Sequence, residues 1–144
     1  MILLDTTVLV YALGADHQLR APARALLELV RDGQVQATAT VEVVQEFAHV
    51  RARRQGRDEA TARAKQYALG LSPLAMPDRV DLLRGLDLFR DLEGLGPFDS
   101  VLAATALDRA WALASADRSF AQVGGLRFLD LSSGTFLEEV RATR

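Results

Sequence analysis

The chain has 144 residues, of which 49% are hydrophobic and 25% charged, values typical of one folded globular domain that we expect to span residues 1–144. It contains no cysteine, which excludes disulfide bonds and thiolate metal sites, and its net charge of -2 gives no overall attraction to nucleic acid. No apolar stretch approaches the roughly 20 residues of a membrane helix, and no signal-peptide pattern is present. We therefore expect a cytoplasmic protein that makes no contact with a membrane.

The first half of the chain alternates between short apolar segments and helical patterns. Ile2–Leu4 predicts a buried strand, and residues 6–9 predict the turn that leads out of it. A second strand is predicted at residues 35–38. Amphipathic spacing and helix-end signals predict three helices in this half, over residues 18–31, 41–54 and 58–69.

The second half begins with a linker or short strand at residues 72–77. Asp78 is a good N-cap for a helix over residues 79–92, and a loop rich in Gly and Pro precedes a helix over residues 99–109. The remaining predicted elements are two strands and a terminal helix, at residues 111–115, 127–131 and 135–140. Strands that alternate with helices predict an α/β fold with a mainly parallel, twisted sheet.

Acidic residues recur next to the predicted strands. Asp5 closes the first strand, Asp117 follows the third, and Glu46 lies in the helix after the second. Asp99 begins a helix that would start on the same side of the sheet, on the helical stripe that carries its apolar residues. Since sites in parallel sheets form outside the carboxyl ends of the strands, we expect these carboxylates to meet at one edge.

Each acid alone also has an ordinary structural interpretation. Asp5 and Asp117 can belong to plain turns. Asp99 can cap its helix, or it can be a first-turn acid that interacts favourably with the helix dipole. Glu46 can be a surface residue that borders the core. Four carboxylates in one pocket, however, repel one another and raise one another's pKa values, and a divalent cation relieves this repulsion. Mg²⁺ and Mn²⁺ are the cations that prefer such oxygen ligands.

Other kinds of site fit these residues less well. Zinc is disfavoured because the chain has no cysteine and its two histidines, His17 and His49, lack a metal-ligand spacing. Phosphatases with an aspartyl nucleophile need a second aspartate two residues after the first, where this chain has Thr7. They also need a late lysine, whereas the single lysine here is Lys65. A nucleotide-binding P-loop sequence is absent.

Four segments, taken in order, carry a family resemblance. They are residues 3–9 (LLDTTVL), 43–47 (VVQEF), 97–106 (PFDSVLAATA) and 113–120 (LASADRSF). Together they resemble the PIN-domain ribonucleases and, among these, the VapC-like toxins of bacterial toxin–antitoxin pairs. The resemblance covers nearly the whole chain, and it implies a PIN-like three-layer α/β/α sandwich.

The resemblance implies an endoribonuclease that depends on Mg²⁺ or Mn²⁺ and hydrolyses RNA phosphodiester bonds, leaving a 5′-phosphate and a 3′-hydroxyl. It implies that the metal is held by Asp5, Asp99 and Asp117. Glu46, the fourth catalytic acid, would bind metal or position the attacking water. Supporting hydroxyl groups would come from two residues beside these acids, Thr7, where serine is commoner in the family, and Ser115, in a threonine position.

The resemblance also implies a homodimer and a small cognate antitoxin protein that occludes the acidic pocket. Two alternatives stay open: a non-catalytic PIN-like module that binds RNA or protein, and an RNA-processing nuclease outside a toxin–antitoxin pair. Arg51, Arg53 and Arg54 follow Glu46 on the same predicted helix. They can contact the RNA backbone, or they can form a solvated helix end that complements the helix dipole.

Overall fold

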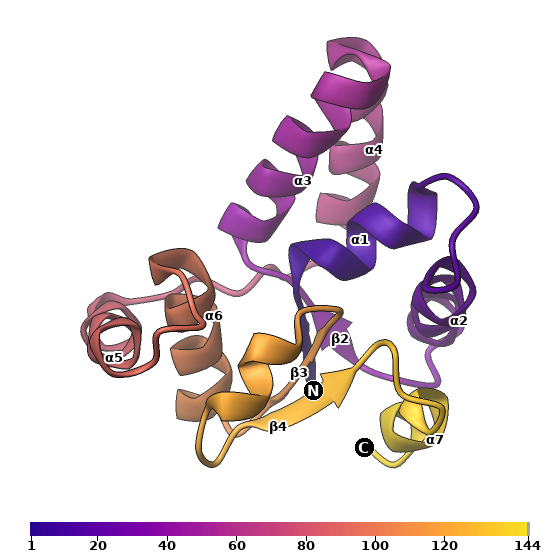
Figure 1. Cartoon of the computed structure of the whole chain (residues 1–144). Coiled ribbons are helices and arrows are strands. Elements are labelled where there is room, and N and C mark those ends of the chain that lie inside the picture. The colour runs from indigo at the N-terminus through magenta and orange to yellow at the C-terminus, as the bar shows by residue number, and fades with distance from the viewer. Residues whose placement is uncertain (144) are drawn as a thin grey trace.

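The computed structural model describes residues 1–143, so residue 144, the last of the expected domain, lies outside the described residues (Figure 1). The strands are β1 (Ile2–Leu4), β2 (Ala37–Thr38), β3 (Ala112–Ser115) and β4 (Arg127–Asp130). The helices are α1 (Thr6–Leu13), α2 (Arg20–Arg31), α3 (Val41–Gln55), α4 (Arg57–Gly70), α5 (Arg79–Asp91), α6 (Pro97–Asp108), the 3-10 helix η1 (Arg118–Gln122) and α7 (Phe136–Arg141). Within the described part of the chain, none of these helices has the length and apolar character that crossing a bilayer requires.

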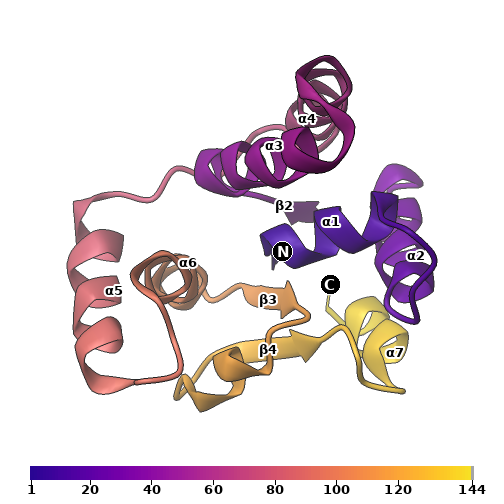
Figure 2. The ribbon, with the colours of Figure 1, turned by 45° about the horizontal axis from the view of Figure 1, so that its top comes forward.

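The strands form one parallel sheet in the order β2-β1-β3-β4. In the register of the sheet, Leu3 of β1 is aligned with Leu113 of β3, and Ala114 of β3 with Leu129 of β4. Helices α5 and α6 lie on one side of the sheet and α2 and α7 on the other, so β1 and β3 are buried along their whole length (Figure 2). The predicted three-layer α/β fold with a parallel sheet is confirmed.

The segment after β1 is a helix, so the turn predicted at residues 6–9 is wrong. Its run of Thr and Val residues has poor intrinsic helix propensity, which favoured the turn. The structure offsets this propensity because Asp5 caps the helix by accepting a hydrogen bond from the backbone N–H of Thr7, and because Val8 and Leu9 are fully buried. Tertiary packing therefore decides that this segment is helical, and the helix places Thr6 and Thr7 beside the edge of the sheet.

A short 3-10 helix, η1, follows β3 where no helix was predicted. The side chain of Asp117 caps it by accepting a hydrogen bond from the backbone N–H of Ser119 at 2.9 Å. Phe120 is fully buried and anchors the helix in the core. The cap holds Asp117 immediately after the strand, at the same edge as Asp5.

Helices α3 and α4 form a hairpin that projects beyond the sheet (Figure 1). Arg51 of α3 donates two hydrogen bonds of 2.7 Å to the carboxylate of Glu59 in α4, and a third to the carbonyl oxygen of Leu13. This pairing lowers the pKa of Glu59 to about 2. The rings of Phe47 and Tyr67 pack edge to face between the two helices, with centroids 4.9 Å apart.

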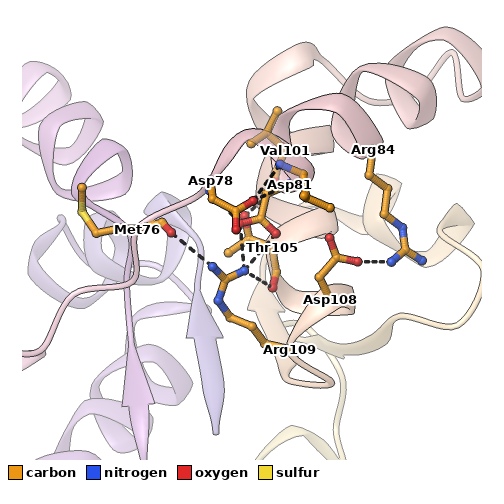
Figure 3. A network of polar contacts seen from close by, with 9 residues as sticks. Met76, Asp78, Asp81, Arg84, Val101, Thr105, Asp108 and Arg109 are labelled. Atoms are coloured by element: carbon orange, nitrogen blue, oxygen red, sulfur yellow. Dashed lines mark hydrogen bonds and ion pairs between the residues drawn. The ribbon is translucent and has the colours of Figure 1, made fainter.

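Helix α5 packs closely on α6, and a buried acid joins the two helices (Figure 3). Both carboxylate oxygens of Asp81 lie 2.9 Å from Nη1 of Arg109, whose other terminal nitrogen donates to the carbonyl oxygen of Met76. A Cβ atom at Gly85 would lie 2.6 Å from the Cα atom of Val101, so the close approach requires glycine. This contact fixes the orientation of α6, which carries Asp99.

Candidate active site

The structure brings the four predicted acids, Asp5, Glu46, Asp99 and Asp117, to one open pocket of about 540 Å³. Asp5 follows β1, Asp117 follows β3, Glu46 lies on α3, and Asp99 lies in the first turn of α6. These elements meet at the carboxyl ends of the central strands (Figure 1). The parallel sheet places the ends of its strands at one edge, which is the reason that acids distant in sequence become neighbours.

Asp5 is the most deeply placed of the four acids, with 3% of its surface exposed. Its Oδ2 atom accepts hydrogen bonds from the hydroxyl of Ser115 at 2.6 Å and from the hydroxyl of Thr7 at 2.7 Å. The other carboxylate oxygen, Oδ1, has no hydrogen-bond partner among the described residues. A buried carboxylate bonded on one side only has its second oxygen free for a ligand.

The hydroxyls of Thr7 and Ser115 also link the two strand ends to each other. Thr7 Oγ1 accepts a hydrogen bond from the backbone N–H of Ala116 at 3.0 Å, and Ser115 Oγ accepts one from that of Asp117 at 2.9 Å. The two hydroxyl oxygens are 3.3 Å apart. Thr7 and Ser115 therefore orient the carboxylate of Asp5, and Ser115 also holds the backbone of Asp117.

The carboxylate of Glu46 is held by Thr6, a residue that the sequence did not assign to the site. The hydroxyl of Thr6 donates a hydrogen bond of 2.5 Å to Oε2 of Glu46. A second acid on the same helix, Glu42, lies one turn earlier and lines a different pocket, between the start of α3 and the helices α5 and α6. Thr6 directly follows Asp5 in the sequence, but the turn predicted at residues 6–9 gave no reason to assign Thr6 to the site.

Asp99 lies in the first turn of α6 without capping it, because the N-cap is Gly96 and the helix begins at Pro97. No hydrogen bond among the described residues involves its carboxylate. Burial, followed by the negative charges of Asp5, Asp117 and Glu46, raises the pKa of Asp99 to about 7. The site thus holds more negative charge than its own residues compensate, which is the electrostatic signature of a cation site.

The carboxylates converge without forming a complete coordination shell. Among residues 1–143, no group of three or more acidic or histidine side chains is arranged to hold a metal ion by itself. The donors that the pocket offers are carboxylate oxygens, and these suit hard divalent cations that keep several water ligands. The residues therefore fit an ion that is bound partly through water.

The three predicted RNA-binding arginines have different surroundings. Arg54 lines the acidic pocket. Arg53 lies in a separate hollow between α3 and α4. The side chain of Arg51 is only 16% exposed and is engaged by Glu59 and the carbonyl of Leu13. Of the three, Arg54 is the one placed to meet a ligand of the acidic pocket.

The far wall of the pocket is formed by residues that the sequence did not assign to the site. Tyr11 of α1 and His17 of the following loop both line it. Their rings lie against each other, with centroids 4.8 Å apart. His17 was considered only as a metal ligand, for which its spacing is unsuitable. A separation of six residues does not match the helical period, and Tyr11 lies in α1 whereas His17 lies in the loop after it, so only the fold of the loop reveals the pair.

The chain matches known proteins over most of its length. The family model of the PIN domain matches residues 2–126. The chain is 48% identical over 125 residues to Ribonuclease VapC7 of Mycobacterium tuberculosis (strain ATCC 25618 / H37Rv), a match that covers 85% of this chain and 86% of that protein. It is 33% identical to Ribonuclease VapC23 of Mycobacterium tuberculosis (strain CDC 1551 / Oshkosh), over 69% of this chain and 78% of the relative.

A solved structure shows the same fold. The crystal structure of DNA-bound VapBC from Salmonella typhimurium contains a chain that superposes with a TM-score of 0.71 at 16% identity, and the match covers 90% of this chain and 97% of that one. The fold, the family model and the sequence identity agree. With residues 2–126 matched by the PIN domain model and 48% identity to Ribonuclease VapC7, this chain belongs to the PIN domain family and, within it, to the VapC-like ribonucleases.

Proposed function

We propose that this chain is a divalent-metal-dependent endoribonuclease and the toxin of a VapBC-like toxin–antitoxin pair. The observation that carries the proposal is the convergence of four carboxylates on one open pocket, where the pKa of Asp99 is raised to about 7. Such a pocket attracts cations, and a bound cation in turn attracts a phosphate group. The similarity to two proteins named ribonucleases supports RNA as the substrate.

Mg²⁺ or Mn²⁺ fits the site because all four acids offer hard oxygen donors. Asp5, Asp99 and Asp117 would hold the ion. When bound, the ion would supply charge neutralisation for the phosphate and would make a bound water more acidic. Binding would also remove the repulsion that keeps the pKa of Asp99 high in the metal-free chain.

The chain's own residues orient the reacting groups. Thr7 and Ser115 donate to one oxygen of Asp5 and leave the other oxygen for the cation. Thr6 fixes one oxygen of Glu46, and the other oxygen can accept a proton from the attacking water or bind metal. Attack in line with the leaving 3′-oxygen leaves a 5′-phosphate and a 3′-hydroxyl on the two RNA fragments.

Arg54 is our candidate for a contact with the RNA backbone at the pocket entrance. It is exposed and lines the pocket that contains the four acids. Arginine forms bidentate contacts with phosphate, and such contacts weaken as salt concentration rises. Arg53 would serve a phosphate further from the cut, whereas the ion pair of Arg51 with Glu59 gives that arginine a structural function.

The test is cleavage of a mixed RNA pool by the purified chain, free of any partner, with Mn²⁺, with Mg²⁺ and with chelator. We expect metal-dependent cleavage that the Asp99→Asn variant loses and that the Asp108→Asn variant keeps. Asp108 is the matched control because it lies on the same helix but pairs with Arg84, away from the pocket. Cleavage that persists in Asp99→Asn, or that ignores the chelator, would refute the proposal.

The partner of this toxin would be a small antitoxin protein that closes the acidic pocket. The excess of carboxylates suits a basic side chain, which would replace the metal ion and block RNA. An RNase toxin of this kind acts on cellular RNA, so we place its activity in the cytoplasm. We expect a short neighbouring reading frame whose product copurifies with the chain and suppresses cleavage, and a product that does neither would contradict the pairing.

The chain also has a surface suited to a homodimer. Among the described residues, six of the seven exposed large apolar side chains lie on α5 or just before it, at Met76, Val80, Leu82, Leu83, Leu86 and Phe89, and the seventh, Leu69, lies on α4. A contiguous apolar helix face of this kind marks a protein–protein contact, and a second copy presents the same face. We expect light scattering to give a dimer mass that Leu83→Glu reduces to that of a monomer. A monomeric parent chain would refute the homodimer.

A further inference from the structure

The acidic pocket extends well beyond the carboxylates, to a wall formed by Tyr11 and His17. Its volume of about 540 Å³ lies in the range of roughly 300–1,000 Å³ typical of pockets for small organic ligands. A single hydrated ion occupies only a small part of such a space. Gly14 and Ala15 line the pocket with little side-chain bulk, so the hollow is continuous from the acids to the aromatic wall.

The loop between α1 and α2 fixes the orientation of His17. The backbone N–H of Leu19 donates a hydrogen bond to Nδ1 of His17 at 3.1 Å, so a neutral imidazole carries its hydrogen on Nε2. No hydrogen bond among the described residues involves Nε2. The imidazole ring lies against the ring of Tyr11 with an interplanar angle of 33°, and His17 is exposed. The pocket thus contains an oriented aromatic surface with a free hydrogen-bond donor.

We propose that Tyr11 and His17 form a subsite that stacks one unpaired nucleobase of the RNA, next to the phosphate bound at the carboxylates. The subsite rests on the proposed ribonuclease function. Proteins bind unstacked RNA bases on aromatic side chains, including His and Tyr, and hydrogen-bond their edges. Arg54 lines the same pocket and can meet the adjoining phosphate, so one pocket holds the groups needed for base, phosphate and metal.

This subsite makes His17 a specificity-determining residue. The exposed ring and its Nε2–H would contact the base beside the cut, whereas the four acids act on the phosphate. A base that stacks and accepts a hydrogen bond from Nε2 would therefore be preferred at that position. Asp16, which also lines the pocket, would accept a hydrogen bond from an amino group of the same base.

The test measures RNA binding apart from cleavage. Its probe is a fluorescent single-stranded RNA of mixed sequence, compared with the same ribose-phosphate chain without bases, in the Asp99→Asn background with Mn²⁺. We expect His17→Ala to weaken binding of the complete RNA about tenfold, within the range for loss of one stacked base. It should leave binding of the base-free chain unchanged. His17→Phe should keep most of the affinity because it keeps an aromatic ring.

The matched control is His49→Ala, because His49 is the other histidine and lies in the hollow between α3 and α4. We expect this variant to bind both probes like the parent. Binding that His17→Ala leaves unchanged, or that it weakens equally for both probes, would overturn the subsite and assign the aromatic wall to a protein contact. In the active chain, His17→Ala should also broaden the base preference at mapped cut sites.

The two proposals fail in different ways. If the parent chain binds RNA in a base-dependent manner that requires His17 but never cuts it, the ribonuclease is refuted and the base subsite stands. If the parent cuts RNA with metal and His17→Ala cuts the same sites with the same KM, the subsite alone is refuted. Absence of RNA binding by the parent refutes both.

Discussion

Replacing Asp99 by Asn should stabilise the metal-free chain while abolishing cleavage. Burial and the charges of Asp5, Glu46 and Asp117 raise the pKa of Asp99 from 3.8 to about 7. At 1.36 kcal/mol per pH unit, this difference corresponds to about 4 kcal/mol of unfavourable free energy for the charged folded state. Asp99 is partly exposed, so solvent screening reduces the value to about 1–2 kcal/mol. Asn has a similar shape and no charge, and it removes this cost.

The extra stability of the Asp99→Asn variant must depend on pH in the way that Asp99 titrates in the parent. Below pH 3.8 the residue is protonated in both the folded and the unfolded chain, so Asp99→Asn should differ little from the parent. As pH rises from 3.8 to about 7, the folded parent keeps a proton that the unfolded chain has lost, so the folded state loses stability. The difference in favour of the variant should therefore grow with pH and level off above about 7.

Urea unfolding in the presence of chelator, at a series of pH values and at low ionic strength, measures this difference directly, because urea adds no ions that screen the charges. A gain of about 1–2 kcal/mol raises the melting temperature of a chain of this size by about 3–6 °C. Asp108→Asn, on the opposite side of the same helix, should show no such rise with pH. Saturating Mn²⁺ should stabilise the parent more than Asp99→Asn. A variant that is less stable at about pH 8, or a gain independent of pH, would refute the reasoning.

Three further changes separate the roles of individual residues. Ser115→Ala removes a hydroxyl that donates to Asp5, the carboxylate that we propose binds the metal. We expect metal affinity to fall about 10- to 100-fold in a calorimetric titration, and unchanged affinity would contradict the supporting role of Ser115. Glu46→Gln should slow cleavage by about 10²-fold or more. The control Glu42→Gln, on the same helix, should cut RNA at the rate of the parent. Equal cleavage rates for the two variants would show that Glu46 does not belong to the site. Arg109→Ala leaves the buried carboxylate of Asp81 without its cation, and we expect it to lower the free energy of unfolding in denaturant by about 3 kcal/mol. The control Arg84→Ala removes an exposed ion pair and should cost less than about 1 kcal/mol. Similar losses for these two arginine variants would show that the buried pair is not structural.

Periodicity and end signals in the sequence were enough to locate most elements. Apart from α1 and η1, each predicted strand or helix agrees with the observed one to within two residues at either end. The agreement has a physical basis, because apolar periodicity and helix-end residues are local signals that can be recognised without knowledge of the tertiary contacts. Asp78 illustrates this: it caps α5 by accepting backbone hydrogen bonds from within its own first turn.

Helix α1 shows where local preference gives way to packing. Its Thr and Val residues favour other conformations, and only burial of Val8 and Leu9 against the sheet, together with the cap by Asp5, forms the helix. Because this helix was expected as a turn, the roles of Thr6 and Tyr11 could not be foreseen. Residues whose function depends on a packing-determined element are hidden from periodicity arguments.

The sequence by itself determined the four candidate acids of this protein and predicted that they meet at one edge of a parallel sheet. That much follows from residue type and spacing, since parallel strands end at one edge. Only the tertiary structure decided which arginine faces the pocket and which pairs within the α3–α4 hairpin, and it alone brought His17 onto Tyr11. These outcomes depend on loop paths and on helix rotation, which are set by contacts between distant segments and not by the local pattern.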